Sequence, residues 1–465
     1  MAPLPRPNCG TVLQHHYHQA DRTLHLPGQG VSEEETMPRQ HSQCERRPSI
    51  QDRSLCSMSG TTKHLMMFVA LLLMCFSVNF CLIVTETAHE ETPDFNLLSG
   101  LTKTFFHKHS EGAPVCSAMD PKNITYTLVT QMSIDRFWLA NRHCRRWKGP
   151  ISMAVVTGRQ SSEDLMRRLQ EKGCDTSLIT IEAVQNIHSE YAVNTLRNMA
   201  IRNVKTSHFV YVDIDFWVSA NLHDVLYMES VRDALAEDPK LALVLPAFAL
   251  AKDYRCEDKD CTDQVKEMMP MHPEQLYALQ NETVETAEHK FVPQVTAFDE
   301  LVNPLGHNTT LYADWYDQTL GSLHPIPCFQ SGKYEPYLVV RYCRDMPPFQ
   351  EDFTGYGKNK VEWIWHLRRV GYIFKQVGQV FVIHYPHKTS RAKRAWDKQS
   401  KKYKLFGNVS SDLATYKRAQ MDEIYVRFRN WLSRMKTPVR TPRCEDWIDT
   451  DNNLWSATPL VEKPW

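Results

Sequence analysis

The chain has 465 residues, of which 42% are apolar and 23% charged, so it can build a packed core and is not disordered throughout. Its length allows two or three domains. Lys plus Arg and Asp plus Glu both total 54. This balance argues against a nucleic-acid-binding protein, which needs a basic surface.

The N-terminal part of the chain has the pattern of a membrane-anchored protein. Residues 1–64 are rich in Pro, Gln, Arg, Ser and His without apolar periodicity, which predicts a disordered cytosolic tail. Residues 65–84 contain no charge, and a helix of this length spans a bilayer core of about 30 Å. Basic residues precede this segment and acidic residues follow it, namely Arg46, Arg47, Arg53 and Lys63, then Glu86, Glu90 and Glu91. The positive-inside rule therefore predicts a type II signal anchor, with a stem at 85–118 and a lumenal body.

Sequons and cysteines agree with this lumenal orientation. Four N-x-[ST] triplets, at Asn123, Asn281, Asn308 and Asn408, all follow the apolar segment. Eight of the thirteen cysteines also follow it: Cys116, Cys144, Cys174, Cys256, Cys261, Cys328, Cys343 and Cys444. Their even number in an oxidising compartment suggests disulfides, and Cys256 with Cys261 is the simplest local pair to propose.

The lumenal body alternates between two periodicities. The pattern predicts strands at 125–131, 151–156, 177–181, 208–212, 241–248, 337–341 and 379–383. It predicts helices at 133–147, 161–172, 193–204 and 360–370, the second opened by a capping box at Ser161. Such alternation favours an α/β domain, assigned to 119–436, with a mainly parallel sheet and helices on both faces. The Pro-rich extension at 437–465 is expected to be irregular.

One acidic pair directly follows a buried strand. The sequence Asp213-Ile214-Asp215 comes after the apolar run 208–212, where the carboxyl ends of strands bind ligands. In an extended chain, residues two apart point to the same face, so both carboxylates could converge. Two hard oxygen ligands suit Mn²⁺ or Mg²⁺ shared with a diphosphate. The same triplet spacing recurs at 258–260 and 449–451, but there without a preceding buried strand.

Several blocks in order resemble the family-49 glycosyltransferases, meaning the glucuronyltransferase domain of LARGE-type proteins and its single-domain relatives. The resemblance covers roughly residues 126 to 390. The blocks are TLVTQMSID (127–135), WKGPIS (147–152), YAVNTLRN (191–198), YVDIDF (211–216), LVLPAF (243–248), EPYLVV (335–340), GYGKNK (355–360) and IHYPH (383–387). Their number and order make coincidence improbable.

The resemblance implies a GT-A fold, which joins an α/β nucleotide-sugar half to an acceptor-binding half. It also implies Mn²⁺ (or Mg²⁺), a UDP-sugar donor and inverting transfer. By position, Asp213 and Asp215 are the expected metal ligands, and His384 is the expected third ligand, with His387 as the alternative. Arg197 and Asn198 are assigned to the donor side, although a helix-packing role fits them about equally well.

One block departs from the family pattern. Relatives read roughly aromatic-Asp-(Glu or Arg)-Arg-Phe before the Gly-x-Gly block, and the Asp is a natural general base. This chain carries Gln350 at that position, and glutamine cannot accept a proton at neutral pH. The candidates for the catalytic base are therefore Glu351, closest to the displaced Asp, and Asp352 after it.

The sequence thus predicts a Golgi type II membrane glycosyltransferase that moves a sugar, by the resemblance glucuronic acid, from a UDP-sugar to a glycan or glycoprotein. The alternative is a catalytically silent lumenal protein that binds glycans or assists another transferase, which Gln350 favours. Expected partners are the nucleotide-sugar donor, the glycan acceptor and the membrane through residues 65–84. Self-association into a homo-oligomer is left open.

Overall fold

A computed structural model describes residues 105, 113–185, 191–251, 259–284, 292–298, 300, 304–388, 390, 393–394 and 413–448. All of these belong to one compact unit, Leu101–Trp465. The predicted tail and membrane segment, most of the predicted stem, and Asn408 lie outside the described residues. Within the described residues, no helix has both the length and the apolar character needed to cross a membrane.

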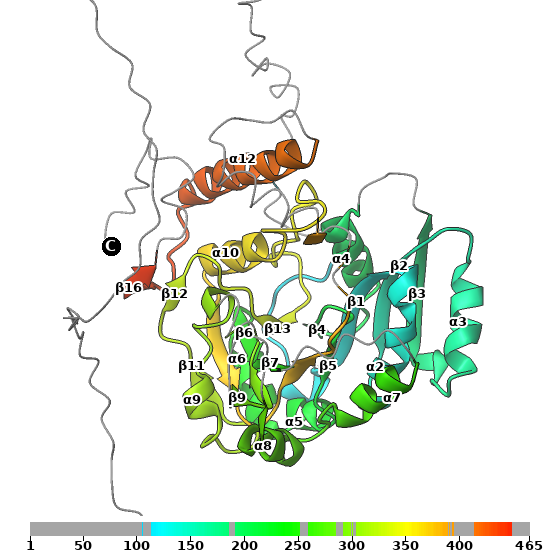
Figure 1. The fold of residues 1–465 in the computed structure, drawn as a ribbon. Helices are drawn as coiled ribbons and strands as arrows, with labels where there is room; N and C mark the ends of the chain where they lie inside the picture. Colours follow the sequence, from blue (N-terminus) through cyan, green and yellow to red (C-terminus); the bar gives the residue numbers. More distant parts are fainter. Residues whose placement is uncertain are drawn as a thin grey trace, which may run out of the picture. The chain divides into compact units, whose positions relative to one another are not determined.

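An eight-stranded sheet forms the centre of the unit, in the order β11-β14-β6-β13-β4-β1-β2-β3 (Figure 1). β13 runs antiparallel to β4 and β6, and β11 runs antiparallel to β14, whereas the other neighbouring strands are parallel. The strands are β1 Tyr126–Ser133, β2 Ile151–Thr157, β3 Ile179–Gln185, β4 His208–Tyr211, β6 Leu241–Leu245, β11 Leu323–Pro325, β13 Tyr337–Arg341 and β14 Ile373–Val377. The predicted α/β class with a mixed, mainly parallel sheet is confirmed.

A second, four-stranded sheet has the order β10-β7-β15-β5. Its strands are β5 Phe216–Val218, β7 Ala247–Leu250, β10 Val295–Ala297 and β15 Val382–His384. β15 pairs antiparallel with β5, which places His384 opposite Phe216. Because β5 follows β4 after a short turn, this pairing brings the chain around residue 384 to the end of the central strand β4.

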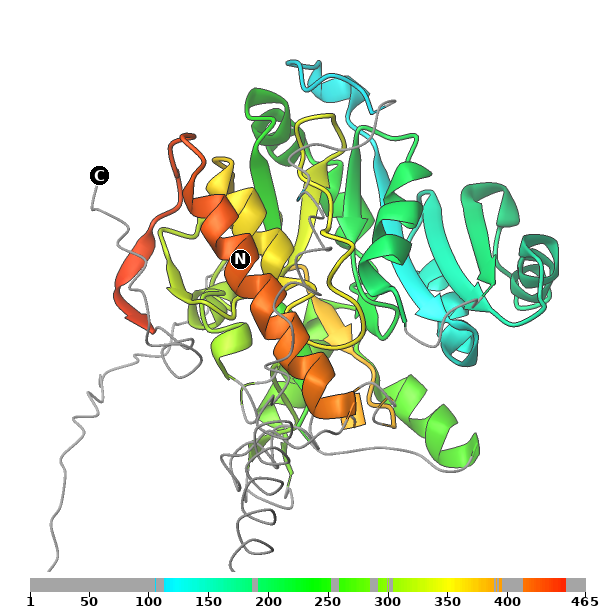
Figure 2. The same cartoon turned by 90° about the horizontal axis from the view of Figure 1, so that it is seen from above.

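Helices cover the sheet and are α2 Ala140–Arg146, α3 Ser162–Gln170, α4 Val193–Arg202, α5 Leu222–Leu226, α6 Glu229–Glu237, α7 Lys259–Met268, α8 Pro273–Asn281, α9 Tyr312–Trp315, α10 Val361–Arg369 and α12 Leu413–Ser433. The predicted capping box opens α3, where the side chains and backbones of Ser161 and Asp164 bond reciprocally. The helix predicted at 133–147 begins instead as a 3₁₀ segment, η2 Ile134–Leu139, before α2. α12 lies across α10 (Figure 2).

Disulfides join distant parts of the unit. The pairs are Cys116–Cys343, Cys144–Cys174 and Cys328–Cys444, which confirms disulfide formation for six of the eight cysteines. The proposed Cys256–Cys261 pair stays a prediction, because Cys256 lies outside the described residues. The expectation of an irregular segment beyond Lys436 is contradicted at Arg443–Ile448, which form β16 and pair with β12, Phe329–Ser331. The remaining short strands, β8 Thr283–Val284 and β9 Val292–Pro293, pair with each other.

Candidate active site

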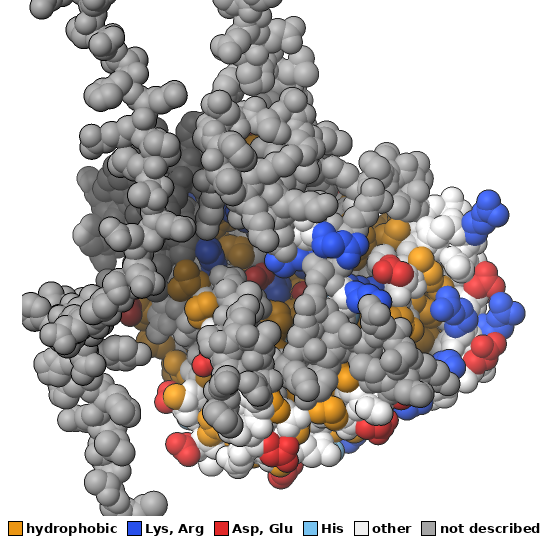
Figure 3. Space-filling view, in the orientation of Figure 1, with side chains coloured by type: hydrophobic (Ala, Val, Ile, Leu, Met, Phe, Trp, Pro, Cys, Tyr) orange, Lys and Arg blue, Asp and Glu red, His pale blue; other side chains and the backbone are white. Residues whose placement is uncertain are grey.

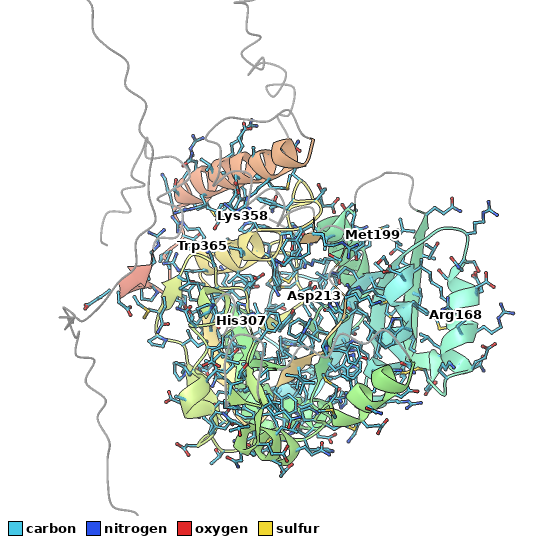
Figure 4. All side chains as sticks on the ribbon, viewed as in Figure 1. Arg168, Met199, Asp213, His307, Lys358 and Trp365 are labelled. Atoms are coloured by element: carbon cyan, nitrogen blue, oxygen red, sulfur yellow. A yellow bond between two sulfur atoms is a disulfide. The ribbon has the colours of Figure 1, made fainter. Side chains whose placement is uncertain are left out.

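The acidic pair lies in the turn that links β4 to β5. The backbone N–H of Phe216 donates to the carbonyl of Asp213 at 2.9 Å, which closes a turn over Asp213–Phe216. The sequence predicted an extended chain here, with both carboxylates on one face. The turn instead gives the two side chains different neighbours. Asp213 lies near the centre of the view in Figure 4.

Polar side chains from several elements surround the carboxylate of Asp213. Oδ1 accepts hydrogen bonds from Tyr211 Oη at 2.5 Å, Gln131 Nε2 at 3.1 Å and Arg197 Nη2 at 3.2 Å. Oδ2 accepts from Tyr337 Oη at 2.9 Å and lies 3.5 Å from Lys360 Nζ. These contacts come from β1, β4, α4, β13 and the residue before α10, so the fold fixes the orientation of this carboxylate.

The electrostatics around Asp213 keep it ionised. Burial by itself raises the pKa of a carboxyl, but the charges of Lys360 and Arg197 and the hydroxyl of Tyr211 outweigh it and hold the pKa of Asp213 well below its usual range. Burial and the neighbouring Asp213 raise the pKa of Tyr337 well above its usual value. The Tyr337 hydroxyl therefore stays protonated and donates to the carboxylate.

Asp215 belongs to a cluster with two histidines. Single ligand atoms of Asp215, His384 and His387 all lie within 4.8 Å of one another. His387 Nε2 is 2.7 Å from Asp215 Oδ2, which also accepts from Arg136 Nη1 at 3.0 Å. Although burial raises the pKa of Asp215, its bonds to His387 and the nearby positive charges lower it to about 2.

The residue types of this cluster fit a divalent ion. Burial lowers the pKa of His384 to about 4, so its ring is neutral at neutral pH and keeps a lone pair for a metal. Mn²⁺ accepts carboxylate and imidazole ligands, whereas Mg²⁺ prefers oxygen ligands throughout. The described residues bring together Asp215, His384 and His387, and Asp213 is not a member of this cluster. The three-ligand assignment that included Asp213 stays a prediction.

The two residues assigned to the donor side differ in their contacts. Arg197 is buried and joins Asp213 to the 355–360 loop, where its Nη1 donates to the backbone carbonyl of Asn359 at 2.8 Å. Asn198 is buried as well, and its amide donates to the carbonyl of Phe349 at 2.8 Å and to Glu351 Oε1 at 2.9 Å. Arg197 thus supports the acidic site directly, whereas Asn198 holds the segment that carries the candidate base.

The candidates for the base lie beside the first turns of α4. Glu351 is exposed, and its Oε2 accepts from Thr195 Oγ1 at 3.1 Å in addition to the bond from Asn198. Asp352 is half-buried. Gln350 is only 2% exposed, and its side chain lies 3.5 Å from Nδ1 of His366 on α10. The side chain of residue 350 therefore faces the interior, next to α10.

Sequence reasoning missed several residues that shape the site. Tyr211, Tyr337 and Lys360 all lie within blocks that resemble the family, but only their contacts with Asp213 give them a role. Glu335, two residues before Tyr337, places Oε2 3.8 Å from Lys360 Nζ. Trp363 and Trp365 of α10 are both buried and belong to the core.

Comparisons with known proteins define the class first. The family model "Glycosyl-transferase for dystroglycan" matches residues 165–416, which is more than half of the chain. This part of the chain includes the β4–β5 turn, both candidate histidines and the segment with Glu351. The chain belongs to this glycosyltransferase family. Its mixed α/β sheet agrees with the expected fold class, and the GT-A fold in particular stays a prediction.

Individual relatives cover similar lengths of the chain. A xylosyl- and glucuronyltransferase LARGE2s of Danio rerio is 31% identical over 266 residues, which are 57% of this chain and 32% of that protein. The glycosyltransferase-like protein gnt14 of Dictyostelium discoideum is 28% identical over 273 residues, 58% of this chain and 38% of that protein. The chain thus spans about a third of the length of the curated relatives it matches. A crystal structure of GalNAc-T7 with UDP, GalNAc and Mn²⁺ aligns with 69% of this chain and 59% of its own, at 12% identity and a TM-score of 0.33.

Proposed function

We propose that this protein is a metal-dependent, inverting glycosyltransferase that moves a sugar, best matched by glucuronic acid, from a UDP-sugar to a glycan or glycoprotein. The observation that carries the proposal is the acidic turn at the end of β4, with a carboxylate held by four side chains and a second one beside two histidines. Membership in the glycosyltransferase family supports the reaction class.

Asp215, His384 and His387 would hold the divalent ion, with Asp213 as a further carboxylate from the same turn. When bound, the ion supplies positive charge that neutralises the diphosphate leaving group. Tyr211 and Tyr337 keep Asp213 oriented, and Arg136 does the same for Asp215. Such contacts to ligands are expected to contribute about 10–100-fold to metal affinity or activity.

Glu351 is the proposed general base. Its carboxylate is exposed, and Asn198 and Thr195 hold its two oxygens by hydrogen bonds. It takes the proton of the acceptor hydroxyl while that oxygen forms a bond to the anomeric carbon and the bond from this carbon to UDP breaks. Asp352 is the second choice on the same segment.

Positive side chains near the acidic turn support an anionic donor. Lys360 and Arg136 each lie beside one carboxylate of the turn, and Figure 3 shows basic side chains near the middle of this face, next to acidic ones. A diphosphate and a uronate carboxylate are both anions that such side chains bind. The name of the zebrafish relative, a xylosyl- and glucuronyltransferase, supports glucuronic acid as the donor sugar.

The decisive experiment is a donor screen with the full chain, purified in detergent and supplied with Mn²⁺. UDP release is measured over a panel of UDP-sugars, with and without a glycan acceptor. We expect turnover with one donor, loss on chelation and recovery on adding Mn²⁺. Turnover that survives chelation would refute the metal-dependent mechanism.

The alternative is a catalytically silent protein that binds glycans or assists another transferase, and Gln350 at the family's Asp position favours it. In this case no UDP-sugar is consumed, while glycan binding persists after chelation. The same preparation separates the two functions, because glycan binding can be measured on an array without any donor.

We also propose that the chain is a type II protein of the Golgi membrane, anchored by residues 65–84. The support is the charge asymmetry around this segment and the position of the sequons after it. Protease treatment of sealed microsomes should leave the C-terminal body intact. Digestion of the body without detergent would reverse the orientation.

A further inference from the structure

The loop 355–360 connects the acidic turn to the C-terminal helix α12. At one end of the loop, Lys360 Nζ lies 3.5 Å from Asp213 Oδ2. Next to it, Asn359 accepts two hydrogen bonds from Arg197 Nη1, at 2.8 Å to its carbonyl and 2.9 Å to its side-chain oxygen. Arg197 also bonds Asp213. Lys360 therefore contacts the acidic turn directly, Asn359 contacts it through Arg197, and both contacts depend on the conformation of this loop.

The backbone of the loop is held in an uncommon conformation. Gly355, Gly357 and Lys358 have φ values of 72°, 95° and 58°. Glycine adopts such angles freely, but a residue with a side chain pays a steric cost, so other contacts must hold Lys358 there. The contacts of the Lys358 side chain provide this support.

The Lys358 ammonium contacts two side chains on one face of α12. Its Nζ lies 3.1 Å from Asp422 Oδ1 and 4.3 Å from the centre of the Tyr425 ring. Asp422 and Tyr425 are three residues apart, so they are neighbours on the helix surface. The side chains of Lys358 and Asp422 are 17% and 10% exposed, so water screens this ion pair only in part.

α12 is itself firmly anchored, which makes it a suitable support. Its apolar face packs on Phe353 and on α10 through a buried cluster of Val361, Trp365, Met421, Tyr425, Phe428 and Leu432. Arg369 of α10 donates to the carbonyl of Leu432 in the last turn of α12 and to the carbonyls of Met435 and Thr437 just beyond it. Figure 4 shows Lys358 and Trp365 on the side of the unit where α12 lies.

We infer that Lys358, Asp422 and Tyr425 form a clamp through which α12 positions Asn359 and Lys360 at the acidic turn. Lys358 and Asp422 are thus positioning residues for the glycosyl transfer, and the inference rests on the proposed function for its kinetic effect. All but the first four residues of α12 lie beyond the end of the family match at residue 416. Asp422 and Tyr425 of the clamp therefore lie outside the region that the family model matches.

The test uses Asp422→Asn, which removes the charge with almost no change of shape, and Glu423→Gln as the matched control. Glu423 is the next residue on α12 and pairs with Arg427 of the same helix, not with the loop. We expect Asp422→Asn to lower kcat/KM for the donor by about 10–100-fold, because small displacements of positioning groups cost this much. Glu423→Gln should stay within about two-fold of the unmodified chain, as expected for a half-buried pair within one helix that does not contact the loop.

Two further variants separate the clamp from the backbone conformation. Lys358→Gly accepts the positive φ without strain but loses the side chain, so it should lose as much activity as Asp422→Asn. The double variant should be no worse than either single one, because both remove the same interaction. Lys358→Arg, which keeps the charge, should retain most of the activity that Lys358→Gly loses.

Hydrogen exchange of the amides at 355–360 provides a readout that needs no substrate. Asp422→Asn should speed exchange in this loop, whereas Glu423→Gln should leave it unchanged. Equal exchange in both variants would overturn the clamp, as would equal kcat/KM. If the unmodified chain consumes no UDP-sugar, the proposed function fails, and the exchange measurement alone decides the clamp.

Discussion

Restoring the family residue at position 350 should destabilise the protein instead of activating it. Gln350 is 2% exposed, and its amide nitrogen lies 3.4 Å from the carbonyl oxygen of Pro348. Its backbone N–H donates to Glu362, a buried carboxyl whose pKa is raised well above its usual value by burial. Gln350→Asp would replace the amide donor beside the Pro348 carbonyl oxygen by a carboxyl. This second carboxyl would also lie near Glu362.

The size of the penalty follows from the cost of burying the charge. An exposed Asp has a pKa of about 3.9, and full burial raises the pKa of a carboxyl by up to about 3–5 units. Keeping it protonated at pH 7 costs about 1.4 kcal/mol per unit, or about 4 kcal/mol over roughly three units. This is a large part of a typical free energy of unfolding of about 5–15 kcal/mol. Protonation of His366, 3.5 Å away from the present amide, would reduce the penalty.

The pH dependence of this penalty determines the direction of the expected change in stability. In the Gln350→Asp variant, the folded pKa of the new carboxyl would lie above its unfolded pKa. Its penalty is therefore absent below the unfolded pKa of about 4 and grows as pH rises to the folded pKa. Gln350→Asn introduces a side chain of the same size without the charge and is the control. We expect the two variants to melt together near pH 4 and to differ by about 8 °C at pH 7, at about 2 °C per kcal/mol.

The opposite result would be informative. If Gln350→Asp is as stable as Gln350→Asn at pH 7 and turns over a UDP-sugar faster than the unmodified chain, residue 350 faces the acceptor. Position 350 would then be the site of the base, and the protein would be naturally impaired. Such a result would contradict the inward orientation of the Gln350 side chain.

Three further predictions concern the proposed base, the proposed metal ligands and the glycosylation sequons. Glu351→Gln should lower kcat by about 10²–10⁴ and leave the affinity for the donor nearly unchanged in a binding assay; an unaltered kcat would place the base elsewhere. His384→Ala and His387→Ala should each weaken Mn²⁺ binding measured by calorimetry, whereas an effect of only one would identify the single histidine ligand. Asn281 is exposed at the end of α8, but Asn308 is half-buried and the Thr310 of its sequon is 5% exposed. Asn281→Gln removes an accessible glycan acceptor and should therefore increase gel mobility, whereas Asn308→Gln should leave the mobility unchanged. A shift with Asn308→Gln alone would contradict the half-buried position of Asn308.

Local sequence patterns were sufficient to locate most elements of the sheet. The strand predicted at 337–341 has the bounds of β13, and the capping box at Ser161 opens α3. These features depend on neighbours in the sequence, namely apolar runs, turn residues and side chains that bond their own backbone. The acidic pair was also located from sequence, because it directly follows a buried strand.

Segments with mixed signals were less well predicted. β14 was missed, and the run 241–248 was predicted as one strand although Pro246 divides it into β6 and β7. α12 was not predicted, because its apolar residues form a buried face only through their packing on Phe353 and α10. Burial of this kind depends on parts of the chain that lie far apart in sequence.

The sequence by itself determined the α/β class, the family resemblance and the presence of two carboxylates after β4. Only the tertiary structure decided the surroundings of each carboxylate. Tyr337 reaches Asp213 because β13 pairs antiparallel with β4, and His387 reaches Asp215 because β15 pairs with β5. Hydrogen bonds act over about 3 Å, whereas these partners are 124 and 172 residues apart, so strand pairing and not the local sequence determines which side chains meet.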